Sequence, residues 1–464
     1  MSIEVSFATY HSTWTVRQSD CDGTTSITDT QPQMLRSKSM KILVIGGGGR
    51  EHAIVWSLLK SADVTEVVCA PGNGGIAQTT RCVSVDVTNL ESMLAVVEAE
   101  RPALTVVGPE VPLALGLVDA LEQRRMRVFG PTKAAARLES SKAFAKAFMQ
   151  RHGIPTAAYA VCTNIDQVRE QLLSFSLPVV VKADGLAAGK GVVICNTRLE
   201  AETAAAEMFS GSLLGTQETE VVLEEFLTGE ELSFFALCDG THAAPIAAAQ
   251  DHKRVGEGDT GPNTGGMGAY STDGLLTAAM RQWLTTNVAQ KVVSGMNSEG
   301  TPFKGILFCG IMMTPRGPMV LEFNTRFGDP ETQAILLRME TDILDLLNAS
   351  IDGNAVLLSV KMRPGASACV IVASGGYPGK YTSGKLIQGI STPSPDDVVV
   401  FHSGTATKNG HLVTAGGRVL AVTAVAPDLR TALDKAYAEI ANISFEGMQY
   451  RRDIGHRALK QEQS

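Results

Sequence analysis

Short apolar runs alternate with helical patterns in the part of the sequence that follows residue 39. These runs are three to five residues long and lie at residues 42–45, 66–70, 104–107 and 127–129. Buried strands that are separated by helices are typical of a parallel sheet with crossover connections. The pattern therefore predicts a doubly wound parallel-sheet α/β domain over residues 40–140.

Strands predominate after residue 141. A helix is predicted over 142–151, with Ser140 or Ser141 as its N-cap. The apolar segments that follow lie at 178–182, 191–194, 221–226, 232–238, 305–313 and 319–323. Such a series indicates an α+β domain. We expect it to cover residues 141–345, with one lobe over 141–230 and a second over 231–345.

The two ends of the chain differ from this central part. A small C-terminal α+β domain is predicted over residues 366–457, from three strand patterns and a final helix near 369–373, 398–402, 418–422 and 429–443. Residues 1–39 are rich in Ser, Thr, Asp and Gln and show no sustained period, which favours a disordered extension or an upstream start codon. The alternative for this extension is an organellar targeting segment.

Composition narrows the classes of function. The chain has 464 residues and a formal net charge of −8, which argues against a nucleic-acid binder because such proteins usually carry a basic patch. Its eight Cys residues form no C-x-x-C pair, which argues against a zinc or disulfide framework and fits a reducing compartment. No apolar run is long enough to span a bilayer. We expect a cytoplasmic monomer that acts on small molecules, without nucleic-acid or membrane partners.

A glycine cluster from Gly46 to Gly49 follows the first strand and opens a helix. Glu51 stands where a dinucleotide-binding fingerprint has its third glycine, which argues against close packing of a pyrophosphate. The loop suits a single phosphate or another anion at the helix N-terminus. A tight turn without a ligand is an equally weighted alternative.

A second glycine-rich loop, over residues 182–191, lies between two predicted strands and contains Lys182 and Lys190. Such a loop can fold over a nucleotide and donate backbone N–H groups to its phosphates, whereas the alternative is a flexible hairpin with solvated lysines. An acidic run over 224–231 ends the next strand. Backbone groups there can pair with adenine and a carboxylate with ribose, although acid pairs usually mark a solvated strand end.

The predicted strand at 319–324 carries oxygen ligands on one face. Period 2 places Glu322 and Asn324 on the same side, and carboxylate and amide oxygens suit Mg²⁺. The charged residues that follow are Arg326, Asp329 and Glu331. A solvated charge cluster is the alternative, but it does not explain the apolar residues that precede it.

A polar segment at 250–254 is followed by a glycine-dense loop at 261–270. Its length and glycine content suit a loop that wraps a small charged substrate, and the alternative is an ordinary surface loop.

Taken in this order, the motifs resemble the ATP-grasp superfamily and, within it, the phosphoribosylamine–glycine ligase (glycinamide ribonucleotide synthetase) family. The segments that carry the resemblance are 46–52, 107–110, 130–131, 140–142, 182–191, 224–231, 250–254, 261–270, 322–331, 374–379 and 416–419. The resemblance covers roughly residues 40–454. It implies an N-terminal α/β domain, two grasp lobes with ATP between them, and a small C-terminal domain.

The resemblance also implies nucleotide and metal contacts at matching positions. The implied ATP contacts are Lys142, Lys182, Leu186, Ala187, Ala188, Gly189, Lys190, Gly191, Glu224, Glu225, Phe226, Leu227 and Glu231. The divalent cation, Mg²⁺ or Mn²⁺, is assigned to Glu322 and Asn324. The preceding strand, over 311–313, supplies no acid, so no third ligand is assigned.

The implied reaction ligates glycine to 5-phosphoribosylamine through glycyl phosphate, with ATP as the phosphate donor. Arg326 is expected near the transferring phosphate, while Asp251 and Lys253 hold the amine substrate and glycine. The implied substrate contacts are Gly48, Gly49, Arg50, Glu51, Gly265, Gly266, Met267, Gly268, Asp329, Pro330 and Glu331. The alternatives are a biotin-carboxylase-like grasp enzyme, a nicotinamide-dependent enzyme and a non-catalytic nucleotide-binding protein.

Overall fold

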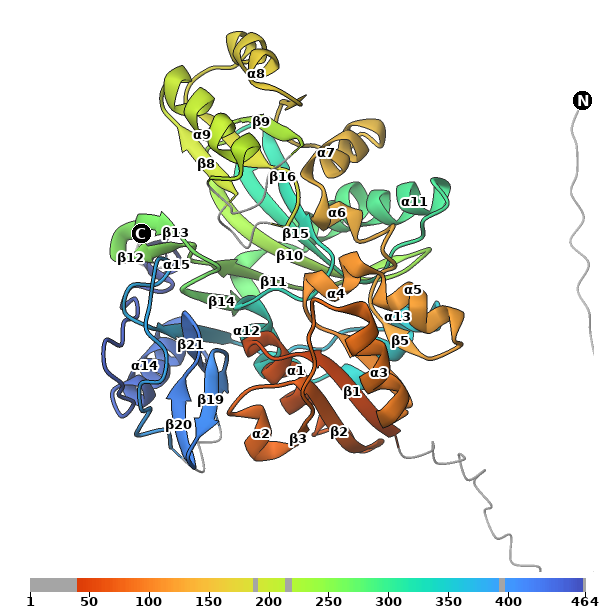
Figure 1. Ribbon diagram of the computed structural model, residues 1–464, viewed down its shortest axis with the longest axis vertical. Coiled ribbons are helices and arrows are strands. Elements are labelled where there is room, and N and C mark those ends of the chain that lie inside the picture. The colour runs from red at the N-terminus through yellow and green to blue at the C-terminus, as the bar shows by residue number, and fades with distance from the viewer. Residues whose placement is uncertain (1–39, 187–190, 213–218, 392–396, 462–464) are drawn as a thin grey trace, which may run out of the picture. The chain divides into compact units, whose positions relative to one another are not determined.

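The computed structural model describes residues 40–186, 191–212, 219–391 and 397–461 (Figure 1). The N-terminal extension lies outside these ranges, as do the predicted nucleotide contacts Ala187, Ala188, Gly189 and Lys190. Within the described ranges, every helix is too short or too polar to cross a membrane.

The first domain contains the parallel sheet predicted from the sequence, with the strand order β3-β2-β1-β4-β5. Its strands are β1 (Met40–Gly46), β2 (Val64–Pro71), β3 (Arg81–Cys82), β4 (Leu104–Val107) and β5 (Val128–Phe129). Its helices are α1 (Gly49–Leu58), α2 (Ile76–Thr79), α3 (Leu90–Glu100), α4 (Glu110–Leu115) and α5 (Leu117–Gln123). The order reverses between β1 and β4, so the loops after these strands meet at the edge where α/β sheets bind ligands.

A four-stranded antiparallel sheet, in the order β6-β9-β7-β8, follows the first domain. Its strands are β6 (Tyr159–Cys162), β7 (Val179–Ala183), β8 (Val192–Cys195) and β9 (Val221–Glu225), and α6 (Arg137–Ser140) and α7 (Lys142–Arg151) precede it. Helices α8 (Ile165–Gln171) and α9 (Arg198–Ser210) pack on this sheet (Figure 1). The buried positions of α9 are mostly alanines, which allows the helix to lie close to the strands.

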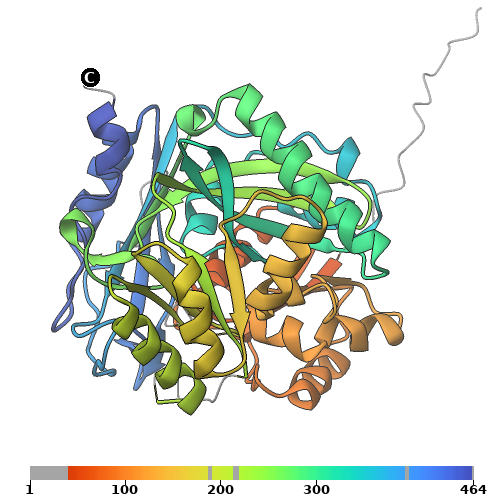
Figure 2. The ribbon, with the colours of Figure 1, turned by 90° about the horizontal axis from the view of Figure 1, so that it is seen from above.

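The largest sheet in the described ranges has eight antiparallel strands. In order they are β16 (Gly317–Asn324), β15 (Lys304–Thr314), β10 (Glu230–Asp239), β11 (Ala243–Asp251), β14 (Gly268–Thr272), β17 (Ala366–Ala373), β21 (Arg418–Ala426) and β18 (Val398–His402). Phe234 and Phe235 on β10 point to opposite faces and belong to different cores. Helices α10 (Ala278–Leu284) and α11 (Gln290–Ser298) cover one face, seen in green in Figure 2, and α12 (Glu331–Arg338) and α13 (Ile343–Ile351) cover the other.

The C-terminal domain shares this sheet with the lobe before it. Strand β14 pairs with β17 from Gly268↔Val370 to Thr272↔Ala366, so the predicted α+β domain is continuous with its neighbour. Its helix α14 (Leu429–Ile440) packs on β17 and β21, and α15 (His456–Gln461) is the last helix in the described ranges. Two hairpins complete the strands: β12 (Arg254–Gly256) with β13 (Thr260–Asn263), and β19 (Thr405–Lys408) with β20 (His411–Thr414).

Candidate active site

Two loops of the first domain close around Glu51. They follow β1 and β4, and a Cβ at Gly46 would lie 2.5 Å from Glu51 Cγ, while one at Gly108 would overlap its carboxylate. The Gly48 N–H group donates a hydrogen bond to Glu51 Oε2 at 2.6 Å. The Glu51 side chain is therefore buried as a brace between the loops, and Gly48 and Gly49 present the N-terminus of α1.

Arg50 and Arg326 share their partners. Both guanidinium groups donate to the carbonyl oxygen of Phe327, at 2.9 and 3.1 Å, and both face Glu110. Arg326 also pairs with Glu139 at 2.8 Å. Burial raises the pKa of Glu139, and the charge of Arg326 opposes this shift. The two arginines thus connect the first domain to the segment that follows β16, through acids that were not predicted as site residues.

Lys142 is the first residue of α7. Ser141 caps this helix, because its Oγ accepts a hydrogen bond from the Phe144 N–H group at 3.0 Å. The ammonium group of Lys142 donates to the carbonyl oxygen of Gly185 at 2.9 Å, where the glycine-rich loop begins. Burial lowers the pKa of Lys142, while Glu322 acts against this shift. The cap therefore holds Lys142 beside the predicted phosphate loop.

Lys182 and Glu224 lie on the neighbouring strands β7 and β9. Glu224 Oε1 is 2.8 Å from Lys182 Nζ, and Lys182 also donates to the carbonyl oxygen of Leu321 at 3.4 Å. The other oxygen, Glu224 Oε2, is 2.8 Å from the ammonium nitrogen of Lys146. Glu224 is only 2% exposed, so its carboxylate is enclosed between two ammonium groups. The signal for Lys146 was its spacing, one helical turn after Lys142.

Glu322 and Asn324 lie near the end of β16, next to these lysines. Burial opposes the charged form of Glu322, but Lys253, Lys182 and Lys142 lower its pKa overall. The Asn324 amide nitrogen, in the orientation that satisfies its hydrogen bonds, donates to Glu139 Oε1 at 3.2 Å, so its oxygen points elsewhere. An ionised carboxylate beside a free amide oxygen fits a hard divalent cation. Among the described residues, His, Cys, Asp and Glu form no group of three or more with metal-binding geometry.

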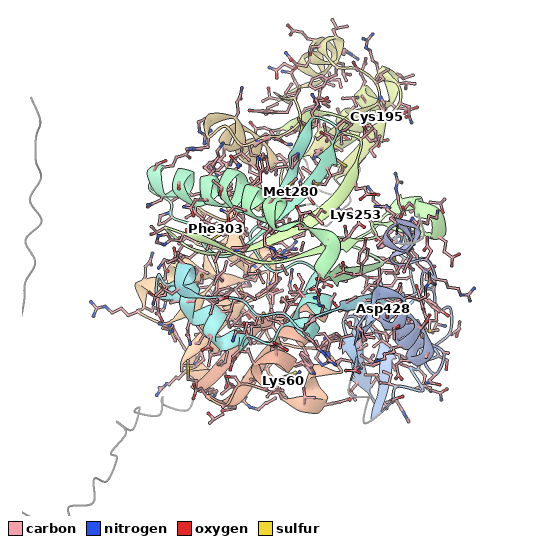
Figure 3. The ribbon with its side chains drawn as sticks, turned by 180° about the vertical axis from the view of Figure 1, so that it is seen from behind. Lys60, Cys195, Lys253, Met280, Phe303 and Asp428 are labelled. Atoms are coloured by element: carbon pink, nitrogen blue, oxygen red, sulfur yellow. The ribbon has the colours of Figure 1, made fainter. Side chains whose placement is uncertain are left out.

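Lys253 follows β11, and Figure 3 marks its place in the fold. Several carboxylates surround its single ammonium group. Lys253 is ion-paired with Glu231, and Glu322 Oε1 lies 3.9 Å from its nitrogen. Burial, together with the charges of Glu331 and Glu231, raises the pKa of Asp251 to about 8, against the opposing charge of Lys253. Burial also raises the pKa of Glu331, which accepts a hydrogen bond from the Ser233 hydroxyl group at 3.0 Å. This part of the site is suited to an additional cationic group.

Arg418, at the start of β21, brings the C-terminal domain to the site. Its guanidinium group donates to the carbonyl oxygen of Asp329 at 2.7 Å and lies 3.3 Å from the Asp329 carboxylate. It also donates to the carbonyl oxygen of Gly265, and a Cβ at Gly266 would lie 2.5 Å from Pro330 Cδ. The structure therefore brings the two predicted substrate segments together. The sequence signal for Arg418 was an arginine after two glycines at the start of an apolar strand.

The other predicted residues lie close to the same strands. Glu225 pairs with Arg316 at 2.5 Å, and Leu227 is buried just beyond the end of β9. Gly191 accepts a hydrogen bond from Ala183 at 2.9 Å. Leu186 is exposed, and Met267 and Gly268 lie at the start of β14 with Met267 buried. Phe226 follows β9 directly and is partly buried.

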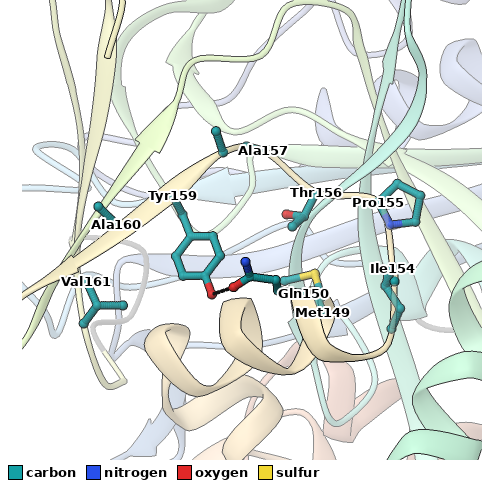
Figure 4. A pocket seen from close by; sticks show the side chains of 11 residues that line it. Met149, Gln150, Ile154, Pro155, Thr156, Ala157, Tyr159, Ala160 and Val161 are labelled. Carbon is teal, nitrogen blue, oxygen red and sulfur yellow. Dashed lines mark hydrogen bonds between the residues drawn. The ribbon is translucent and has the colours of Figure 1, made fainter. Parts of the chain in front are cut away.

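A separate hollow lies between the last turn of α7 and β6 (Figure 4). Its volume is about 680 Å³, and its lining includes Gln150 and Tyr159, whose hydroxyl group donates to Gln150 Oε1 at 2.7 Å. The lining contains none of the predicted site residues. The hollow is therefore distinct from the cluster around Glu322 and Lys253.

Models of one family match three consecutive parts of this chain. The N domain of phosphoribosylglycinamide synthetase matches residues 40–139, its ATP-grasp (A) domain matches residues 140–332, and its C domain matches residues 367–457. The chain belongs to the phosphoribosylglycinamide synthetase family. It is a carbon–nitrogen ligase, and its ATP-grasp domain implies the use of ATP with a divalent cation.

Several phosphoribosylglycinamide synthetase relatives match nearly the whole chain. The phosphoribosylamine–glycine ligase of Xylella fastidiosa (strain Temecula1) is 48% identical over 427 residues, which are 91% of this chain and 99% of that protein. The corresponding ligase of Vibrio parahaemolyticus is 46% identical and covers 91% of this chain and 100% of its own length. The crystal structure of the Thermotoga maritima ligase superposes with a TM-score of 0.79 at 34% identity, covering 89% of this chain and 100% of that chain. The family and fold class predicted from the sequence are confirmed.

The synthetase fold is shared more widely. A biotin carboxylase of Campylobacter jejuni superposes with a TM-score of 0.69 at 14% identity, covering 89% of this chain and 94% of that chain. At this identity the likeness shows a common fold and nothing about substrates.

Proposed function

We propose that the chain joins glycine to 5-phosphoribosylamine with ATP, giving glycinamide ribonucleotide, ADP and phosphate in de novo purine biosynthesis. One observation carries this proposal: Glu322 is held among the ammonium groups of Lys142, Lys182 and Lys253, next to a cluster of buried carboxylates. Ammonium groups and a metal ligand suit the phosphates of ATP, and the carboxylates suit an amine substrate. The near full-length match to phosphoribosylamine–glycine ligases supports the same reaction.

In the proposed first step, an oxygen of the glycine carboxylate attacks the γ-phosphorus, and the bond between this phosphorus and ADP breaks. In the second step, the amine of 5-phosphoribosylamine attacks the acyl carbon of glycyl phosphate, and phosphate leaves. Lys142 and Lys182 neutralise the phosphates, and Arg326 stabilises the transferring phosphoryl group. These residues act by position and charge, so neither step requires a nucleophilic side chain.

The proposed nucleotide contacts lie on β7, β9 and the segments that follow them. Leu186 and Gly191 flank the glycine-rich loop, and backbone groups of residues 225–227 read the adenine edge. Glu224 acts through Lys182, because its carboxylate is enclosed between lysines. Glu231 is the proposed ribose contact, and its ion pair with Lys253 also supports a position next to the proposed amine-binding carboxylates.

Glu322 and Asn324 are the proposed metal ligands. A bound Mg²⁺ or Mn²⁺ ion would supply charge neutralisation and polarisation of the phosphate oxygens. Hard oxygen ligands favour Mg²⁺ as the working ion. We expect activity to be lost with a chelator and restored by Mg²⁺ at lower concentration than by Ca²⁺, because Ca²⁺ prefers more ligands at longer distances.

The amine-binding region is proposed to include Asp251, Glu331 and Lys253. The carboxylates receive the ammonium group of glycine, and Lys253 keeps them from repelling one another. The phosphate of 5-phosphoribosylamine binds at the N-terminus of α1, at Gly48 and Gly49, with Arg50 and Glu51 supporting this loop. The segments that complete the substrate pocket are Gly265 to Gly268 and Asp329 to Pro330, which Arg418 holds together.

A substrate-omission assay tests the proposed function. ADP is expected to form rapidly only when glycine, 5-phosphoribosylamine and ATP are all present. Equal ADP formation without either substrate would count against the ligase. Bicarbonate in place of glycine serves as the control for a carboxylase activity, and stimulation by bicarbonate would favour that alternative. Calorimetry with NAD tests the remaining alternative, which tight binding of NAD would support.

We also propose that the protein acts as a cytoplasmic monomer. The relatives named above are bacterial phosphoribosylamine–glycine ligases, which supports the location. Light scattering after size-exclusion chromatography tests the monomer, for which a mass near 49.1 kDa is expected.

A further inference from the structure

Lys146 is a buried lysine to which the proposed reaction gives no part. It lies on α7, and its side chain is only 2% exposed. The ammonium group pairs with Glu224 Oε2 at 2.8 Å and donates to the Thr156 hydroxyl group at 2.7 Å. That hydroxyl group donates in turn to the carbonyl oxygen of Val320 on β16 at 2.6 Å. Both of these partners of the ammonium group, Glu224 and Thr156, lie within the protein.

Glu224 joins Lys146 to Lys182. Its two oxygens are each 2.8 Å from one ammonium nitrogen, and the two lysines have no other acid at this distance among the described residues. The three side chains together carry one net positive charge. Without the charge of Lys146, the carboxylate would fully neutralise Lys182, and the attraction of Lys182 for phosphate would fall.

Stability alone does not account for this arrangement. Buried ion pairs are often no more stabilising than apolar side chains of similar volume, because both charges lose their hydration. Burial lowers the pKa of Lys146 to about 8, against the charge of Glu224, which shows that the site works against the ammonium form. A methionine in place of Lys146 would fill the same space without this desolvation.

We infer that Lys146 is a positioning residue for the nucleotide: by holding one oxygen of Glu224, it leaves Lys182 with an uncompensated charge directed at the ATP phosphates. The inference rests on the proposed contact between Lys182 and ATP. Thr156 orients Lys146 and ties it to β16, the strand that carries Glu322. Glu224, Lys146 and Thr156 therefore form a chain of contacts from Lys182 on β7 to β16, which carries the proposed metal ligand Glu322.

The test compares Lys146→Met with the double variant Lys146→Met/Glu224→Gln. In the single variant, Glu224 pairs only with Lys182, so the KM for ATP is expected to rise about tenfold. The KM for glycine should stay within about twofold, because Lys182 does not contact glycine. In the double variant the carboxylate charge is gone and Lys182 is free again, so the KM for ATP should return to within about threefold of wild type.

Calorimetry with Mg²⁺ and a non-hydrolysable ATP analogue provides the matching binding measurement. Lys291→Met is the control, since it is the same chemical change at a half-buried lysine whose ammonium group donates to the carbonyl oxygen of Gly153 at 2.7 Å. Thermal melting establishes that each variant is folded, and Lys146→Gln replaces Lys146→Met if the latter does not fold.

The outcomes separate the inference from the proposed function. An unchanged KM for ATP in the folded single variant would overturn the inference. A double variant that binds ATP no better than the single variant would also overturn the inference. If Lys146 had only a structural role, the effects of the two substitutions on ATP binding would add. Wild-type protein without ATP-dependent ligation would instead overturn the proposed function.

Discussion

Individual side chains at the site are held in charge states that their burial disfavours. Burial alone would raise the pKa of Glu322, yet Lys253, Lys182 and Lys142 lower it. Asp251 shows the opposite outcome, because burial and neighbouring acids outweigh Lys253 and raise its pKa to about 8. The pKa values of these two carboxyl groups are therefore shifted in opposite directions, which fits the proposed roles of Glu322 as a metal ligand and Asp251 as a substrate contact.

Replacement of Glu322 by Ala is expected to lower kcat by at least about a hundredfold, because phosphate charge is no longer neutralised by a bound cation. The fold should persist, since the side chain is 35% exposed and its nearest ion-pair partner is 3.9 Å away. ADP release and thermal melting measure the two effects. Glu91→Ala, on the exposed face of α3, is the control, and wild-type activity in Glu322→Ala would remove this residue from the metal site.

Replacement of Asp251 by Asn should change how stability depends on pH. The folded-state pKa of Asp251, about 8, lies above its ordinary value of 3.8, so the folded state retains a proton that the unfolded state releases. The stabilisation from this proton is complete below pH 3.8 and is lost as the pH rises through about 8. The free energy of unfolding of the wild type should therefore fall relative to Asp251→Asn across this window. Denaturant titrations at several pH values measure it, and parallel curves would contradict the shift.

At the scale of helices and strands, strong apolar periodicity was sufficient for prediction. The boundaries of β4, β18 and α7 agree with the sequence pattern, and β1, β9 and β15 differ by one or two residues. Strand β11 was missed because it is rich in alanine, whose β-propensity is low, and β3 because it has only two residues. Strand β11 forms because neighbouring strands and helices bury it, and β3 because it pairs with β2, and no local sequence window records either contact.

At the candidate site, too, the residues in local motifs could be predicted from the sequence, whereas the contacts between distant strands could not. Lys142, Lys182 and Glu322 stand in recognisable motifs, so their types and spacing were enough to select them. The enclosure of Glu224 between two lysines depends on β7 and β9 being neighbours, although they lie far apart in sequence. The contacts of Arg418 depend likewise on a sheet that crosses a domain boundary.

Within the molecule as a whole, the C-terminal domain contacts the N-terminus of α1. The Asn73 amide group donates to the carbonyl oxygens of Gly47, at 2.9 Å, and His402, at 2.8 Å. A Cβ at Gly49 would lie 2.5 Å from the Ser403 hydroxyl oxygen and 2.6 Å from the Gln333 amide nitrogen. A Cβ at this position would require both side chains to move, so the proposed phosphate-binding loop and the C-terminal domain pack closely at Gly49.

Replacement of Gly49 by Ala is expected to lower the stability of the fold, whereas the same change raises stability in an ordinary helix. In an ordinary helix this change stabilises by about 0.5–1 kcal/mol, because glycine is a poor helix former. Here we expect destabilisation of about 1–3 kcal/mol and a higher KM for 5-phosphoribosylamine, since Ser403 and Gln333 must move. Gly274→Ala is the matched control, because a Cβ there meets no atom within 4 Å. A more stable Gly49→Ala variant would show that the contact is loose.

The eight-stranded sheet has a mechanical consequence. Strand β14 of the second lobe pairs with β17 of the C-terminal domain along five residue pairs, so these two parts share one continuous sheet. In the described ranges, the four-stranded sheet shares no strand with the eight-stranded sheet. An isolated backbone bridge joins Thr156, which precedes β6, to Val320 on β16. We therefore expect any change in the angle between the two sheets to be taken up in the short connections at residues 153–157 and 226–229. A nucleotide that contacts both Lys182 and Glu322 would fix this angle.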